Sequence, residues 1–207
     1  MQKMTPEDIK AALLVSQQNG TLVEVYNFAD DDTFNVGFVI ATDQSFVLLM
    51  TLDWDAKVNG LTAIRLTSIH AVRSQTDYLT TVSYKTKVAH QYHYFDLWHL
   101  QERLRSHDYR HRPILQTLLH EAVAEKEPVV IGTKKYKGRD DFEGVIAQLG
   151  EIKLTLHYYN EHDLSSLWEY ELLLAQIDYL RVFGSQGRTT AAVLAGVFDL
   201  ATGPQMG

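Results

Sequence analysis

Arginine, histidine and tyrosine side chains gather in the segment RLRSHDYRHRP, residues 103–113. Guanidinium groups bind phosphates through paired N–H donors, and an interleaved aromatic ring can stack on a base. A second basic stretch, KKYKGR, spans residues 134–139. The candidate nucleic-acid-binding residues are Arg103, Arg105, Tyr109, Arg110, Arg112, Lys134, Lys135, Lys137 and Arg139. The alternative interpretation is a solvated linker whose arginines pair with carboxylates such as Glu102 and Asp108.

Histidine is the other residue type with possible chemistry in this region. His107 and His111 are four residues apart, a spacing that places two imidazoles on one face of a helix, as a zinc site requires. No third ligand stands at a recognised spacing, and His120-Glu121 lacks the second histidine of an H-E-x-x-H helix. Motifs of hydrolases, dinucleotide-binding enzymes and kinases are also absent. The sequence therefore predicts no catalytic residue, no metal site and no cofactor.

The bulk composition limits the possible compartment and partners. The chain has 207 residues, no cysteine and a formal net charge of −7. The lack of cysteine excludes disulfides and thiolate metal sites. The negative charge opposes broad attraction to nucleic acid or anionic lipid, although a local basic patch remains possible. Since no apolar run approaches the roughly 18 residues of a membrane span and no export signal is recognised, we expect a cytoplasmic protein without membrane contact.

The elements that must hold these residues occur twice along the chain. A shift of 106 residues places Val39–Ala41 on Val145–Ala147, both of which read VIA. The same shift places Phe46, Leu48 and Met50 on Ile152, Leu154 and Leu156. Two residues are then inserted, and the apolar pattern of Ile64–Arg73 recurs in Leu172–Arg181. Chance similarity is the alternative, but the conserved order and spacing favour a tandem duplication.

Each copy is predicted to begin with a helix and to continue as short strands. Thr5 and Pro6 mark the start of the first helix and Asn19-Gly20 its end, while Pro113 opens the second and Pro128 follows it. Apolar and β-branched runs predict strands at 22–28, 34–42, 45–53, 61–73, 128–136, 142–149, 151–159 and 168–183.

The patterns that predict secondary structure are weaker in the segments outside the repeat. Alternation over residues 78–94 predicts one or two further strands, and the apolar spacing in 95–104 predicts an amphipathic helix. Residues 189–200 fit either a strand or a helix.

Gly37, Asp43 and the alternating Phe46, Leu48 and Met50 resemble the first motif of the Sm-like small-barrel family. A glycine in the second strand suits a strand that bends sharply across a small barrel. The resemblance implies a helix followed by short, strongly bent strands in each copy. The asparagine that follows the family's aspartate is absent. At the shift of 106 residues, Leu149 stands at the position of Asp43, and Gly144 is displaced by one residue from Gly37. The resemblance therefore supports the fold and not the family's uridine-binding chemistry.

We predict an α+β, mostly β chain of two tandem helix-led Sm-like small-barrel units, packed through a central helical segment. The first unit spans 1–88, the connector 89–112 and the second unit 113–207. The loop after the first strand is acidic in the first copy, with Asp30, Asp31 and Asp32, and basic at 134–139 in the second. Opposite charges at equivalent places could join units within a chain or head to tail between chains.

The leading hypothesis is a non-catalytic binding or assembly protein that acts through protein partners or self-association. The second hypothesis is binding of RNA or single-stranded nucleic acid through Arg103–Arg112 and the Lys134–Arg139 loop. The third is a small-ligand or metal-dependent enzyme.

Overall fold

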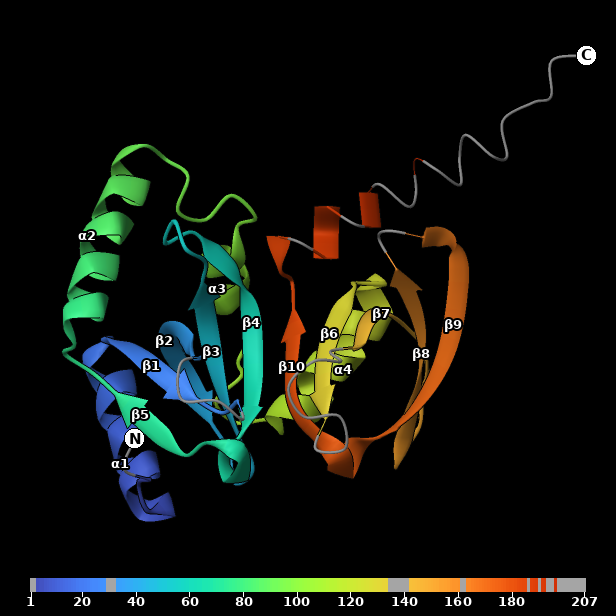
Figure 1. Ribbon diagram of the computed structural model, residues 1–207, viewed down its shortest axis with the longest axis horizontal. Coiled ribbons are helices and arrows are strands. Elements are labelled where there is room, and N and C mark those ends of the chain that lie inside the picture. Colours follow the sequence, from blue (N-terminus) through green and yellow to red (C-terminus); the bar gives the residue numbers. More distant parts are fainter. Residues whose placement is uncertain are drawn as a thin grey trace, which may run out of the picture.

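Ten strands form one open antiparallel sheet in the computed structural model (Figure 1). The structure describes residues 3–28, 33–133, 142–160, 163–185, 187–189, 191–192 and 196, without the side chains of 159, 160 and 163–167. The strands are β1 (Leu22–Tyr26), β2 (Asn35–Thr42), β3 (Phe46–Leu52), β4 (Val58–Arg65), β5 (Ala71–Arg73), β6 (Val129–Thr133), β7 (Phe142–Leu149), β8 (Lys153–Asn160), β9 (Asp163–Leu173) and β10 (Ile177–Val182). The helices are α1 (Pro6–Asn19), α2 (Asp77–Gln91), α3 (Leu100–Ser106) and α4 (Ile114–Glu125), and the 3-10 turns are η1 (Leu66–Ser68) and η3 (Leu174–Gln176). The prediction of a mixed, mostly β chain is confirmed.

The two halves of the sheet have the same strand order. The first half runs β5-β1-β2-β3-β4 and the second β10-β6-β7-β8-β9. The helix before each half, α1 or α4, ends at a residue in the left-handed conformation, Gly20 or Lys126. The halves meet where β4 pairs with β10. Two separately closed barrels are therefore not observed, because β4 pairs with a strand of the other half and leaves β5 and β9 as the outer edges.

The predicted alignment of the repeat is wrong by one residue in its middle part. Val25 and Ile131 are equivalent at a shift of 106, but Asn35 and Phe142, their partners across the ladder, are equivalent at a shift of 107. The loop between the first two strands is therefore one residue longer in the second half. The two VIA triplets are therefore not structurally equivalent, and their match at a shift of 106 is a coincidence.

Gly37 and Gly144 are equivalent at this shift, and neither is displaced relative to the other. Gly37 stands opposite Thr51 and Gly144 opposite Tyr158. A Cβ added at either glycine would collide with a carbonyl oxygen of the neighbouring strand. The bend of the second strand therefore requires glycine in both halves.

A substitution at Gly144 tests this requirement. We expect Gly144→Ala to lower the free energy of unfolding by about 1–3 kcal/mol, because the backbone of β8 cannot yield as a flexible side chain would. Gly196→Ala is the matched control, since a Cβ there meets no atom within 4 Å. Chemical denaturation measures both. Equal stability of the two variants would show that the close approach is not needed.

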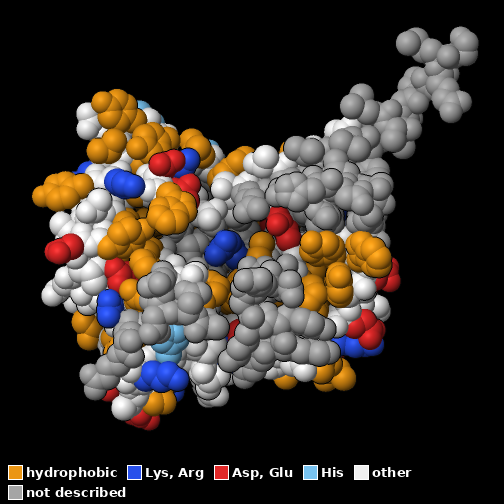
Figure 2. Space-filling view, viewed as in Figure 1, with side chains coloured by type: hydrophobic (Ala, Val, Ile, Leu, Met, Phe, Trp, Pro, Cys, Tyr) orange, Lys and Arg blue, Asp and Glu red, His pale blue; other side chains and the backbone are white. Residues whose placement is uncertain are grey.

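The connector is helical where the alternation predicts strands. Thr76 caps α2 by accepting the Leu79 N–H, and Leu79, Val82 and Ala89 are the buried residues of this helix. The prediction of strands over 78–94 is wrong because exposed aromatic side chains produced the alternation: Tyr84 and Tyr92 are 65% and 67% exposed. Hydrophobic side chains accordingly gather on the surface over α2 (Figure 2). The helix predicted over 95–104 occurs slightly later, as α3.

Two hydrophobic cores hold the sheet and its helices. In the first, Ile9 and Leu13 of α1 pack against one face of β1, β2, β3 and β4. The second core includes Leu48 and Met50 on the other face of the first half and continues through Leu119 of α4 into the second half. In Figure 1, α1 and α2 lie on the outer side of the first half, while α4 lies behind β6. The shared core and the β4–β10 ladder together join the halves.

Candidate functional site

The junction between the halves is built from backbone pairing and a few polar side chains. Ile64 stands opposite Tyr179, and Thr62 opposite Arg181. Arg65, at the end of β4, donates from Nε to the Ile177 carbonyl at 2.7 Å and from Nη2 to the Leu174 carbonyl at 3.2 Å. Because Thr62 is fully buried, this contact is a packed interface and not a loose edge.

The two edge strands of the sheet, β5 and β9, are equivalent in the repeat to β10 and β4, the two strands that pair at the junction. Val72 of β5 and Leu180 of β10 stand opposite the equivalent residues Val25 and Ile131, at a shift of 108. The same shift relates Ile64 of β4 to Leu172 of β9, because Ile64 stands opposite Val47 and Leu172 stands opposite Leu154, the equivalent residue of the second half. Each edge strand therefore matches a strand that already has a partner inside the chain. An edge strand presents unpaired N–H and C=O groups and is a template for pairing with another chain.

The β9 edge lies beside a cluster of three aromatic side chains. The ring centroid of Tyr170 is 4.9 Å from that of Phe142 and 5.7 Å from that of Tyr158. The equivalent positions in the first half hold Asn35, Thr51 and Thr62. Tyr170 is 38% exposed, and its strand neighbours Glu169 and Glu171 are exposed as well. The edge therefore presents an aromatic side chain on one face, while Glu169 and Glu171 contact His157 and Lys153 on the other.

The β5 edge carries one exposed cation and is partly covered by the N-terminal segment. Arg73 lies over the Tyr26 ring, with Cζ 5.4 Å from the centroid. Burial, and then a hydrogen bond to Glu24, raises the pKa of Tyr26. Met4 donates its N–H to the His70 carbonyl at 3.0 Å and accepts the Val72 N–H on its sulfur at 3.2 Å. Met4 therefore occupies backbone groups that a further strand would use.

Arg103 and Tyr109, two of the predicted nucleic-acid contacts, take part in an internal network. Arg103 donates to Glu121 at 2.9 Å and to Glu125 at 2.6 Å, and its Cζ lies 3.8 Å from the centroid of Phe183. The Tyr109 hydroxyl donates to Glu121 at 2.8 Å. These contacts tie α3 and the connector to α4 and to the end of β10.

The pKa shifts in this network follow from burial and pairing. Burial alone would lower the pKa of Arg103, but hydrogen bonds to Glu125 and Glu121 raise it above its usual value. Burial raises the pKa of Tyr109, and the Arg103 guanidinium lowers the pKa of Glu125. The network is therefore charged at neutral pH and stabilises the packing of α3 on α4.

The other predicted basic residues do not come together with Arg103 and Tyr109. Arg105, Arg110 and Arg112 are exposed, and none of the ion pairs among the described residues involves them. Nearby, His111 contacts Asp108 at 2.7 Å, and this hydrogen bond lowers the pKa of Asp108. Lys134, Lys135, Lys137 and Arg139, and the acidic Asp30, Asp31 and Asp32, lie outside the described residues.

Asp43 has a structural role that its sequence position does not show. Its Oδ1 accepts the N–H groups of Ser45 and Phe46, and its Oδ2 accepts the N–H of Ile114 at 2.7 Å. The carboxylate therefore closes the turn between β2 and β3 and holds the first residue of α4 against the first half. The equivalent residue is Gly150 and not Leu149, since both Asp43 and Gly150 donate their N–H to the carbonyl three residues later.

Among the described residues, no group of three histidine or acidic side chains could hold a metal ion. Within the same residues, no helix is both long and apolar enough to cross a membrane.

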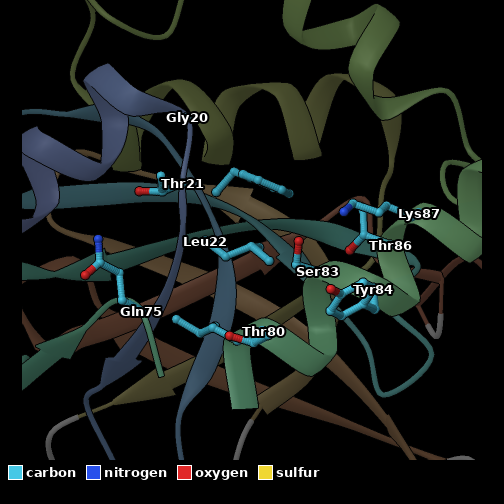
Figure 3. A pocket seen from close by; sticks show the side chains of 11 residues that line it. Gly20, Thr21, Leu22, Gln75, Thr80, Ser83, Tyr84, Thr86 and Lys87 are labelled. Atoms are coloured by element: carbon cyan, nitrogen blue, oxygen red, sulfur yellow. The ribbon is translucent and has the colours of Figure 1, made fainter. Parts of the chain in front are cut away.

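Two hollows lie on the first half. One, of about 440 Å³, opens between α2 and the turn that joins α1 to β1; Figure 3 shows Ser83, Tyr84 and Lys87 on the helix side and Thr21 and Leu22 on the other. Its polar groups are largely engaged: the Thr80 and Thr86 hydroxyls bond within α2, and Lys87 lies over the Tyr84 ring. The second hollow reaches Arg181 of β10.

The two sheet edges are therefore the best-defined candidate site. Sequence patterns missed the aromatic cluster, because Phe142, Tyr158 and Tyr170 come together only through strand pairing. The equivalence of Arg73 and Arg181 was visible in the repeat, although nothing in the sequence identified their strands as an edge and its paired counterpart. Comparisons with protein-family models, curated proteins and solved structures each found no match to this chain.

Proposed function

We propose that this is a non-catalytic assembly protein whose copies join head to tail, the β9 edge of one copy pairing with the β5 edge of the next. We also propose that each half is a Sm-like unit, which has the helix-led strand order but does not close into a barrel of its own. The observation that carries the proposal is the β4–β10 ladder, in which the equivalent strands already pair within one chain. A heterologous contact of this kind leads either to a closed ring or to an open filament.

The repeat specifies the register of the contact. Within the chain, β4 and β10 pair through Ile64–Tyr179, Ala63–Leu180, Thr62–Arg181 and Leu61–Val182. Replacing each residue by its repeat equivalent at a shift of 108 gives the expected pairs between copies: Leu172–Ala71, Glu171–Val72, Tyr170–Arg73 and Glu169–Ser74.

This register places an arginine on an aromatic surface. Arg73 stands opposite Tyr170, while the neighbouring Glu169 and Glu171 point to the other face of the sheet. A guanidinium on an aromatic face contributes roughly 0.5–2 kcal/mol, depending on desolvation.

The most direct experiment on the wild-type chain is sedimentation velocity over a wide concentration range. We expect species heavier than the 23.6 kDa chain that dissociate on dilution. A single 23.6 kDa species at every concentration would oppose the proposal.

Met4 is expected to weaken association, because it covers the β5 edge. Met4→Ala removes the sulfur that accepts the Val72 N–H, and we expect it to tighten self-association modestly, by about two- to five-fold. Lys3→Ala, which leaves that contact intact, is the control. Looser association of Met4→Ala would mean that Met4 supports the edge and does not cap it.

A further inference from the structure

A hollow of about 430 Å³ lies where the first half meets β10, and we name it the junction pocket. Its lining combines the aromatic residues Phe34, Trp54 and Tyr78 with the amides of Asn35 and Asn59 and the guanidinium of Arg181. Arg181 comes from the second half of the chain and the other five from the first. A volume of this size suits a small organic molecule.

Arg181 brings a partly buried charge that the described residues leave almost without partners. Among them, its side-chain hydrogen bond is a long one, from Nη2 to Asn35 Oδ1 at 3.4 Å, and its enclosed Nε has no partner. None of the ion pairs among the described residues involves Arg181, whereas Arg103 and Arg188 each pair with glutamates. Buried polar groups are normally satisfied, so a partly buried guanidinium in this condition indicates a partner from outside the chain.

The remaining polar groups favour a ligand that accepts hydrogen bonds. Asn59 already accepts the Ser185 hydroxyl on Oδ1, which leaves its amide N–H groups as donors. Asp53, the acidic residue of the lining, is engaged by the N–H groups of Asp55 and Lys57 and by the Lys57 ammonium at 3.6 Å. The unused groups of the pocket are therefore mostly donors.

The rim of the pocket offers a surface for a flat, apolar ring. Trp54 is 82% exposed, which is unusual for so large an aromatic side chain. Its carbonyl accepts a hydrogen bond from Lys85 at 2.8 Å, which holds the β3–β4 turn against α2. Tyr78 packs edge to face on Phe34, with centroids 5.4 Å apart.

The equivalent place in the second half is closed by aromatic side chains. Asn35, Thr51 and Thr62 correspond there to Phe142, Tyr158 and Tyr170, whose rings contact one another. The pocket is therefore a specialisation of the first half and not a general consequence of the repeat.

We infer that the junction pocket binds a small aromatic carboxylate, with the carboxylate on Arg181 and the ring against Trp54 and Tyr78. Arg181 is the only basic side chain among the described residues that line the pocket, and Asp53 lies in the same lining. A monoanion fits this charge better than a phosphate dianion or a nucleic-acid strand does. The planar guanidinium also matches the two oxygens of a carboxylate. This inference does not depend on head-to-tail assembly.

The test uses the full chain with benzoate and indole-3-acetate as probes and neutral benzamide as the matched control. Titration followed by ligand-detected NMR and by tryptophan fluorescence should show saturable binding of the two carboxylates and at least about ten-fold weaker binding of benzamide. Arg181→Met should lose the preference for the carboxylates, while Arg105→Met, an exposed arginine elsewhere, should keep it.

Trp54→Ala provides a second test of the pocket, which remains valid even where Arg181→Met does not fold. Because its side chain is mostly exposed, the fold should persist, and binding of both carboxylates should weaken by about ten-fold. Equal binding of benzoate and benzamide, absence of saturable binding, or wild-type affinity in Trp54→Ala would each overturn the inference.

Discussion

Replacing Arg73 with glutamate should leave the protein as single chains at concentrations where the wild type assembles. In the proposed register, Arg73 faces Tyr170 of the next copy, while Glu169 and Glu171 point to the opposite face of the sheet. The variant would lose the contact between the guanidinium and the aromatic ring and would place a carboxylate against the aromatic cluster, where the described residues offer no cation. We expect the dissociation constant to rise by at least about ten-fold, measured by sedimentation velocity.

A charge exchange distinguishes a broken interface from a damaged fold. Tyr170→Lys alone should also weaken assembly, because the lysine would face Arg73 across the interface. Combining Arg73→Glu with Tyr170→Lys should restore it, since opposite charges then face each other. Arg110→Glu carries the same charge change at an exposed residue outside the described ion pairs and should assemble normally. Thermal melting of each variant checks the monomer, because Arg73 also stands opposite Glu24 within the chain. Failure of the double variant to regain association would reject the register.

Removing the charge of Arg103 is expected to have the largest effect on folding stability. Arg103→Met keeps much of the side-chain volume but leaves Glu121 and Glu125 without their cation and removes the guanidinium from Phe183. We expect a loss of about 2–4 kcal/mol in the free energy of unfolding, because breaking one side of a partly buried ion pair leaves uncompensated charge. Urea denaturation at neutral pH measures this loss.

Arg105→Met is the matched control for this stability prediction. It removes the same charge two residues away in the same helix, where the side chain is exposed and forms no ion pair with the described residues, so its effect should stay within about 0.5 kcal/mol. Equal losses in the two variants would show that the network around Tyr109 contributes nothing beyond surface charge. A nucleic-acid-binding role for Arg103 would require this network to open.

The repeat and its helix boundaries could be predicted from the sequence because they rest on local signals. Thr5, Pro6 and Gly20 bound α1 as expected, with Thr5 accepting the Asp8 N–H and Gly20 in the left-handed conformation. Apolar runs found most strands of both halves for the same reason, since burial of one face imposes the pattern. The runs at 61–73 and 168–183 each predict one strand and instead hold two strands separated by a 3-10 turn, so that part of the prediction is wrong.

Other features depend on contacts that no local pattern carries. The extra residue between Gly132 and Phe142 is invisible to apolar spacing, because two neighbouring positions in β3, Leu48 and Leu49, are both buried on opposite faces. The role of Asp43 depends on Ile114, which is 71 residues away. The pairing of β4 with β10 likewise joins distant segments, so no local pattern predicts the open edges that define the candidate site.

Disulfide trapping in the predicted register tests head-to-tail assembly most directly, and the absence of native cysteine makes it unambiguous. Ser74→Cys and Glu169→Cys stand opposite each other only between copies and leave Arg73 and Tyr170 intact. Under mild oxidation, a chain that carries both cysteines should form a ladder or ring of linked copies on a non-reducing gel. Either single variant can form dimers at most. Ser74→Cys/Ile152→Cys, whose second cysteine lies at an exposed position away from the edge, is the control. A Ser74→Cys/Glu169→Cys chain that gives no more than this control would contradict the proposed assembly.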